Sequence, residues 1–160
     1  MEFTAEQKKN IYPFSPDTIS RRMGFCLGNA FLCTMTAPWD DGVEDCEQAQ
    51  FFLKMEEESP QITISPIDRL IVDDGCRKLI EHLHILDGDM LWLDIAGNLR
   101  DFVAFFQAYM LNIGQAQVFS THHMEGMKKA LERLRHILYR RNNAFAYEGM
   151  TGLPFVQEAK

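Results

Sequence analysis

The most regular hydrophobic pattern of the chain lies between Thr121 and Arg141. Apolar side chains recur there in alternating steps of three and four residues, at Met124, Met127, Leu131, Leu134 and Leu138. This spacing places them on one side of a helix, and we call these five residues the seam. Because they span barely two heptads, they fit either the core-facing side of a helix or the self-association surface of a homodimer.

Helix starts are legible at several other places. Ser15-Pro16 predicts a helix to about Thr36, and Ser65-Pro66 predicts one whose apolar stripe is interrupted at residues 73–75. A capping box at Thr4 predicts a short opening helix that ends before Pro13. Further helices are expected from the cap at Asp41 to about Glu57, and along the stripe from Ile95 to Ile113, which Gly114 closes.

These patterns predict a mainly α fold, a single-domain bundle of about five helices over residues 1–160. Residues 61–64 look extended, and 69–73 and 90–95 also fit buried strands, so a short β element near 61–64 or 90–95 is the alternative. The uncharged run from Met23 to Trp39 is too short and too polar for a membrane span. It predicts a buried helix in which Gly24 and Gly28 allow close approach of a second helix.

The C-terminal tail, residues 144–160, is apolar and punctuated by glycine. Exposed apolar segments promote aggregation, so we expect this tail to dock on the body of the protein or on a partner.

Composition and charge narrow the possible functions. The 160 residues are 46% hydrophobic and 24% charged, with a net charge of −7, which is typical of a globular protein. The first 117 residues carry nine Lys/Arg against nineteen Asp/Glu. This acidity argues against general nucleic-acid affinity and favours a basic protein partner. A polar start and four cysteines without CxxC spacing predict free thiols and a cytoplasmic location.

Two charged surfaces are candidates for contact with other molecules. The predicted partner-binding residues are acidic: Asp40, Asp41, Glu44, Asp45, Glu47, Glu56, Glu57 and Glu58. The opposite charge gathers around the seam in a basic face that comprises Lys128, Lys129, Arg133, Arg135, Arg140 and Arg141. Salt bridges with the acidic half or a nucleic-acid groove would both account for this basic face.

Signatures of catalysis are weak. Phosphate loops, dinucleotide-binding glycines, zinc-binding helices and nucleophile elbows are all missing from the sequence. Glu44 and Glu47 have a spacing that holds Mg²⁺ in some nucleotide hydrolases, but the second acidic pair of such enzymes is missing. The histidines are too scattered to predict a metal site, and we expect no cofactor. His122 and His123 are expected to titrate near neutral pH because a helix start lowers a histidine pKa.

The sequence therefore favours a small acidic cytosolic protein-protein interaction module without catalysis, of the inhibitor, adaptor or immunity and anti-defence type. One alternative is a Mg²⁺-dependent nucleotide hydrolase that uses Glu44 and Glu47 with Asp73 or Asp74. The other is a nucleic-acid-binding regulator that uses the basic helix over residues 121–141.

Overall fold

The computed structural model describes residues 12–39, 42–60, 64–85, 88–113 and 117–151. These residues form six α-helices and one 3-10 helix and contain no strand. The elements are α2 (Asp17–Ser20), α3 (Phe25–Thr36), η1 (Ala37–Trp39), α4 (Val43–Glu58), α5 (Pro66–Ile85), α6 (Met90–Leu111) and α7 (Gln117–Thr151). The predicted mainly α bundle is confirmed.

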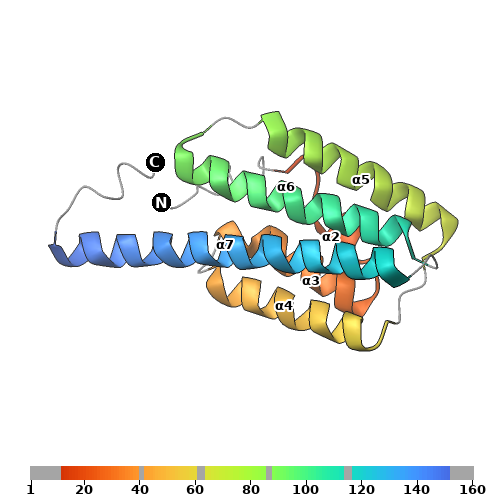
Figure 1. The fold of residues 1–160 in the computed structure, drawn as a ribbon. Helices are drawn as coiled ribbons and strands as arrows, with labels where there is room; N and C mark the ends of the chain where they lie inside the picture. The colour runs from red at the N-terminus through yellow and green to blue at the C-terminus, as the bar shows by residue number, and fades with distance from the viewer. Residues whose placement is uncertain (1–11, 40–41, 61–63, 86–87, 114–116, 152–160) are drawn as a thin grey trace.

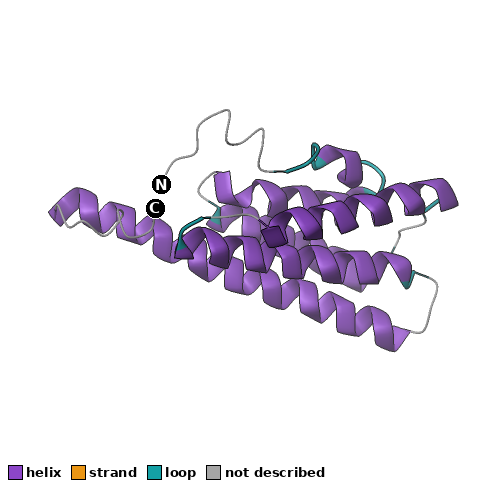
Figure 2. Cartoon of the chain, turned by 90° about the horizontal axis from the view of Figure 1, so that it is seen from above, coloured by secondary structure: helices purple, strands orange, loops and turns teal. Residues whose placement is uncertain are grey.

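The long helices lie side by side in one bundle, and α4, α5, α6 and α7 alternate in direction (Figure 1). α6 packs against α5 and α7, while α4 packs against α3 and α7. The short α2 lies across α3 and also contacts α5. The cartoon in Figure 2, turned by 90°, shows the same arrangement from above. The protein core thus lies among α3, α4, α5, α6 and α7.

Aromatic and branched side chains fill the core. Phe31 of α3 packs on Phe106 of α6 with ring centroids 4.9 Å apart, and Phe102 lies 6.0 Å from Phe106. All three rings are buried. Gly126 of α7 faces the ring of Phe105, where a Cβ would come within 2.4 Å of ring carbons. A glycine at this position lets α6 and α7 approach closely.

A second cluster fixes the corner where η1 meets α7. The ring centroids of Trp39 and Trp92 lie 6.1 Å apart, and the Tyr12 hydroxyl donates a hydrogen bond of 2.6 Å to the Met35 carbonyl. The guanidinium of Arg141, which is only 6% exposed, donates a hydrogen bond of 2.9 Å to the Pro38 carbonyl. This contact anchors α7 to the chain between α3 and α4.

The expected helix from Pro16 to Thr36 is wrong in one respect, because the structure divides it into α2 and α3. The chain turns at residues 21–24, where Gly24 has a φ of 76° that favours glycine. As a result α2 packs against α3 so closely that a Cβ on Gly28 would lie 2.3 Å from the Ser20 carbonyl oxygen. The predicted close approach is confirmed at Gly28, where the partner is the short preceding helix. It is wrong at Gly24, where nothing lies within 4 Å of an added Cβ.

The start of α5 agrees with its capping signal. α5 begins at Pro66, and the Asp68 backbone NH donates a hydrogen bond of 3.1 Å to the Ser65 hydroxyl. α5 runs unbroken through residues 73–75, so the interruption of the apolar stripe there does not end the helix. The helix excludes the alternative strand at 69–73.

At the start of α6, the Asp89 carboxylate accepts a hydrogen bond of 2.8 Å from the Trp92 NH and fixes the first turn. The alternative strand at 90–95 is therefore wrong, because these residues open α6. Residues 61–63, with most of the other alternative β element, lie outside the described residues.

Other expectations concern helix ends. α4 begins after Gly42, and Asp41, the expected cap, lies outside the described residues, as do Gly114 and the opening helix from Thr4. α7 is longer than expected, and its last turns extend beyond the end of the bundle (Figures 1 and 2). Docking of the tail, residues 144–160, stays a prediction.

Candidate functional site

The acidic residues predicted to bind a partner separate into distinct positions. Glu44, Glu47, Glu57 and Glu58 are exposed on α4, and Asp45 is half-buried. Glu57 forms an ion pair of 2.6 Å with Lys128 of α7. Glu56 is only 2% exposed, so its assignment to an exposed acidic surface is wrong. Asp40 and Asp41 lie outside the described residues.

Large apolar side chains are exposed on the same side of α4. Phe51 is 59% exposed and Met55 is 36% exposed, and Phe25 at the start of α3 is 68% exposed. The half-buried Phe52 joins them, because its ring centroid lies 5.6 Å from that of Phe25 and 5.8 Å from that of Phe51. We call the apolar residues and the exposed glutamates beside them the α4 face, which comprises Phe25, Phe51, Phe52, Met55, Glu44, Glu47 and Glu58.

The helical repeat explains why these side chains share one side. Cys46, Ala49 and Leu53 of α4 point into the core and are fully buried. At 100° per residue, Phe51 falls on nearly the opposite side of the helix, the side that also carries Glu47 and Glu58. An exposed phenylalanine is thus held within an acidic stripe.

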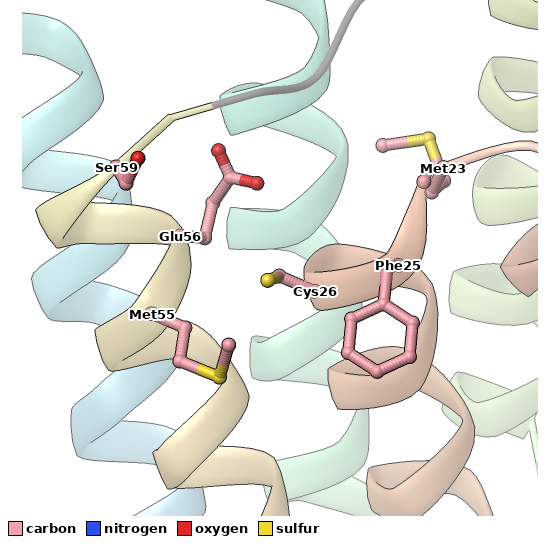
Figure 3. A pocket seen from close by; sticks show the side chains of 7 residues that line it. Met23, Phe25, Cys26, Met55, Glu56 and Ser59 are labelled. Atoms are coloured by element: carbon pink, nitrogen blue, oxygen red, sulfur yellow. The ribbon is translucent and has the colours of Figure 1, made fainter.

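A pocket of about 270 Å³ opens beside the α4 face, between the start of α3 and the end of α4. Its lining includes Met23, Phe25, Cys26, Met55, Glu56 and Ser59, and Figure 3 shows these side chains around the space. Phe25 and Met55 belong to the α4 face as well, so the pocket and the face are continuous. Within the pocket the Cys26 thiol points toward α4 and the Glu56 carboxylate (Figure 3).

Glu56 is the charged residue that lines this pocket, and its charge reaches groups on two neighbouring helices. Burial raises the pKa of the Cys26 thiol, and the negative charge of Glu56 raises it further. Burial also raises the pKa of Tyr109 on α6 to about 12, with Glu56 and then Glu57 as additional causes. Both groups are therefore protonated at neutral pH.

The seam belongs to the core of this chain. Met124, Met127, Leu131, Leu134 and Leu138 are all 0–2% exposed. They face α4 and α6, the neighbours of α7. Of the two readings that the spacing allowed, the structure has the core-facing one. Self-association through these five side chains is therefore wrong, because no apolar surface on them is left for a second copy.

The residues of the predicted basic face do not form one exposed surface. Lys128 pairs with Glu57 at 2.6 Å, and Arg133 with Asp101 at 3.5 Å. Arg141 is buried at the η1 corner. Arg135 pairs with Glu132 at 2.8 Å, while Lys129 and Arg140 are exposed. Much of the basic charge is thus compensated within the chain, as the salt-bridge alternative predicts.

Hydrogen bonds from Arg135 and Gln50, in that order, lower the pKa of Glu132 to about 2. The carboxylate thus ties α4 to α7. The pKa of His123 is lowered, as expected, but its first cause is burial and its second is the adjacent His122. The helix start is not the cause, because α7 begins several residues earlier, at Gln117.

Metal-binding groups do not gather in the structure. Among the described residues, no three His, Cys, Asp or Glu side chains are placed to hold a metal ion together. Glu44 and Glu47 lie on the outer side of α4, whereas Asp73 of α5 accepts a hydrogen bond of 2.7 Å from Gln107 and pairs with Arg77. The described part of the chain therefore does not bring the proposed hydrolase carboxylates together.

Sequence reasoning missed the apolar half of the α4 face. Phe51 and Phe52 were available as a signal, because a core stripe at Cys46, Ala49 and Leu53 already predicts that Phe51 points outward. The pocket had no such signal, because its lining comes from two segments of the chain and no local sequence pattern predicts how they pack together.

None of the helices in the described residues has both the length and the apolar content needed to cross a membrane. Comparison of the chain with protein-family models, with curated proteins and with solved structures finds no match.

Proposed function

We propose that this chain is a protein-binding module whose contact surface is the α4 face, and that its partner presents a basic, partly apolar segment. The observation that carries this proposal is the contiguous cluster of the exposed Phe25, Phe51 and Met55 and the half-buried Phe52, beside exposed glutamates. Contiguous apolar patches rimmed by polar residues mark interaction sites in proteins of this size. Aromatic side chains are also the commonest contributors to binding energy at such sites.

Charge complementarity supports a basic partner. α4 carries six carboxylates, at residues 44, 45, 47, 56, 57 and 58, and a single cation, Lys54. A positively charged segment is attracted to such a surface, and the attraction raises the association rate. The apolar side chains then supply the energy that slows dissociation.

A nucleic-acid groove and a nucleotide hydrolase have less support. Nucleic acids are anionic, and the exposed aromatic side chains that could stack on bases lie beside glutamates. Three basic residues of α7, Lys128, Arg133 and Arg135, form ion pairs with Glu57, Asp101 and Glu132. The α4 face is thus suited to a cationic partner.

Fluorescence anisotropy with a labelled amphipathic helical peptide of leucine and arginine tests the proposal. The peptide should bind the full chain, and Phe51→Ala should weaken binding by about tenfold or more, as expected for a buried aromatic anchor. Leu70→Ala is the matched control, because Leu70 is also an exposed apolar residue, 70% exposed, but lies on α5. It should leave the affinity unchanged.

A second pair of variants tests the charge. Glu47→Lys on the α4 face and Glu81→Lys on α5 change the net charge equally, and both positions are exposed. Only Glu47→Lys should weaken binding of the peptide substantially. Equal effects of the two variants, or equal effects of Phe51→Ala and Leu70→Ala, would contradict a contact surface on α4. A wild-type dimer in sedimentation that Phe51→Ala dissociates would instead identify a second copy as the occupant.

A further inference from the structure

A second pocket, of about 230 Å³, opens at the junction of α6 and α7. It is lined by Phe105 of α6 and by His122, Glu125, Gly126, Lys129 and Arg133 of α7. Four of these α7 residues, at positions 122, 126, 129 and 133, follow one another at steps of three or four and so share one side of the helix. That side is opposite the buried seam, so the pocket lies on the outer surface of the bundle.

One end of this pocket is aromatic. A Cβ on Gly126 would come within 2.5 Å of three ring carbons of Phe105, so the glycine lets that ring lie against the α7 backbone. Phe105 is half-buried and lines the pocket, which leaves part of its ring accessible. The exposed His122 ring stands edge-on to it, with the two centroids 6.1 Å apart. Two rings in this arrangement offer stacking and edge contacts to a planar aromatic group.

The positive charge available to a ligand comes from Lys129. Two other charged side chains of the lining already have partners, since Arg133 pairs with Asp101 at 3.5 Å and Glu125 lies 3.8 Å from Lys128. Lys129 is exposed and forms no ion pair or hydrogen bond with the residues that the structure describes. Its ammonium can therefore bind an anion without giving up a contact within the chain.

The spacing of the two ends defines the ligand. Lys129 lies three residues after Gly126, about 4.5 Å farther along the helix axis than the point where the Phe105 ring rests. A ligand that uses both ends has a planar aromatic ring joined directly or by a short link to an anionic group. An anion without a ring would have one exposed ammonium, a contact that contributes little by itself. A cation would be repelled by Lys129.

The pocket is separate from the α4 face. α4 packs on one flank of α7, where Lys128 pairs with Glu57, and α6 packs on the other flank, where Arg133 pairs with Asp101. The pocket lies on the α6 flank, and its available charge is positive where that of the α4 face is negative. Binding there does not depend on the proposed protein-binding function.

We propose that this pocket binds a small organic anion in which an aromatic ring is joined to a phosphate or a carboxylate. The ring lies against Phe105 and His122, and the anionic group lies on the Lys129 ammonium. Nucleotides and aromatic carboxylates share this chemistry. Both combine a flat apolar surface with a negative charge at one end, and the probes below distinguish them.

Titration of the ¹⁵N-labelled full chain, followed by the NMR shifts of its backbone amides, tests the pocket. Adenosine monophosphate represents the nucleotides and 2-naphthoate the aromatic carboxylates. Adenosine and 2-naphthol lack the charge, and inorganic phosphate lacks the ring. At least one of the two ring-bearing anions should shift the Gly126 amide, and its affinity should be about threefold or more above that of each matched control. The tighter of the two identifies the anionic group that the pocket prefers.

Two pairs of variants test the assigned contacts. Lys129→Ala should weaken binding of the anion by about threefold or more, while Arg140→Ala should not. Arg140 is the matched control because it is an exposed cation on the same side of α7, about three turns from the pocket. Phe105→Leu should weaken binding by about fivefold or more through loss of stacking, and Phe51→Leu on the exposed α4 face should have no effect.

Three results would overturn the proposal. The first is that neither ring-bearing anion shifts the Gly126 amide, or that the shifts gather around Phe51 and Met55 instead. The second is that the uncharged rings or inorganic phosphate bind as tightly as the anions. The third is that Lys129→Ala and Arg140→Ala have equal effects, which would mean that the anion responds only to the overall charge of α7. The wild-type probe series decides the matter even if Phe105→Leu does not fold.

Discussion

The contact between Gly28 and α2 gives a sharp test of the fold. A methyl group added at residue 28 would lie 2.3 Å from the Ser20 carbonyl oxygen and 3.2 Å from its carbonyl carbon. Normal carbon–oxygen contacts are about 3.3 Å or longer, so α2 must move by about 1 Å to admit it. Moving α2 also displaces Ile19, a fully buried side chain that approaches Gly75 of α5.

The expected cost follows from two opposed terms. Overpacking of a filled interior costs about 1–3 kcal/mol, and replacing glycine by alanine in a helix returns up to about 1 kcal/mol. The added methyl group meets backbone atoms of Ser20, which cannot move aside as a side chain can, so the upper part of the overpacking range applies and Gly28→Ala should lower the free energy of unfolding by about 1–2 kcal/mol. For a chain of this length, that corresponds to a fall in melting temperature of roughly 2–8 °C.

Urea denaturation followed by circular dichroism at 222 nm measures this change. Gly97→Ala is the matched control, because Gly97 also lies within a helix but its added Cβ would meet only the Arg100 side chain, at 4.0 Å. That variant should raise the free energy of unfolding by roughly 0.5–1 kcal/mol. The described packing of α2 on α3 would be refuted if Gly28→Ala were as stable as the wild type or as Gly97→Ala.

Three further predictions concern the bundle. The low pKa of Glu132, about 2, means that its folded-state interactions contribute stability above the ordinary carboxyl pKa of 4.5, and that this contribution is lost as pH falls toward 2. Urea titrations should therefore find that Glu132→Gln is less stable than wild type at pH 7, with the difference shrinking as pH falls below 4.5. Arg141→Ala should lower the free energy of unfolding by about 1.5–3 kcal/mol, because the Pro38 carbonyl loses its hydrogen bond from a charged, buried donor. The loss should also shift the fluorescence emission of Trp39, the residue next to Pro38. Leu131→Ala should lower the free energy of unfolding by about 2–5 kcal/mol, and the unfolding midpoint should not depend on protein concentration, since the side chain packs within one chain. A midpoint that depends on concentration would show that the seam is a dimer interface.

How much of the candidate site could be predicted depends on how local its determinants are. The exposed glutamates of α4 follow from one helix and its repeat, and Glu44, Glu47 and Glu58 lie outward as that repeat requires. Glu56 is different, because its direction on α4 points toward α3. Only the position of Cys26 and of the pocket walls across that gap shows that this carboxylate is buried rather than part of the surface.

The helical class and several helix boundaries follow from local signals, because caps and apolar spacing act within a few residues. Ser65 with Pro66 specifies where α5 begins. The start of α6 was expected at Ile95, whereas the helix begins at Met90, after the Asp89 cap. The spacing of apolar residues over 124–138 also predicts the seam, but it predicts only that one side of a helix is apolar.

Contacts between helices set which surface that apolar side of α7 packs against. Burial against α4 and α6 is a property of helices that are distant in the chain, so no local pattern could assign the seam to the core rather than to a second copy. The same reason applies to the turn at Gly24, which depends on α2 having room to fold back over Gly28, and to the pocket at Glu56. Local spacing fixes which residues share a side of a helix, while the free energy of packing between helices selects the neighbour that each side contacts.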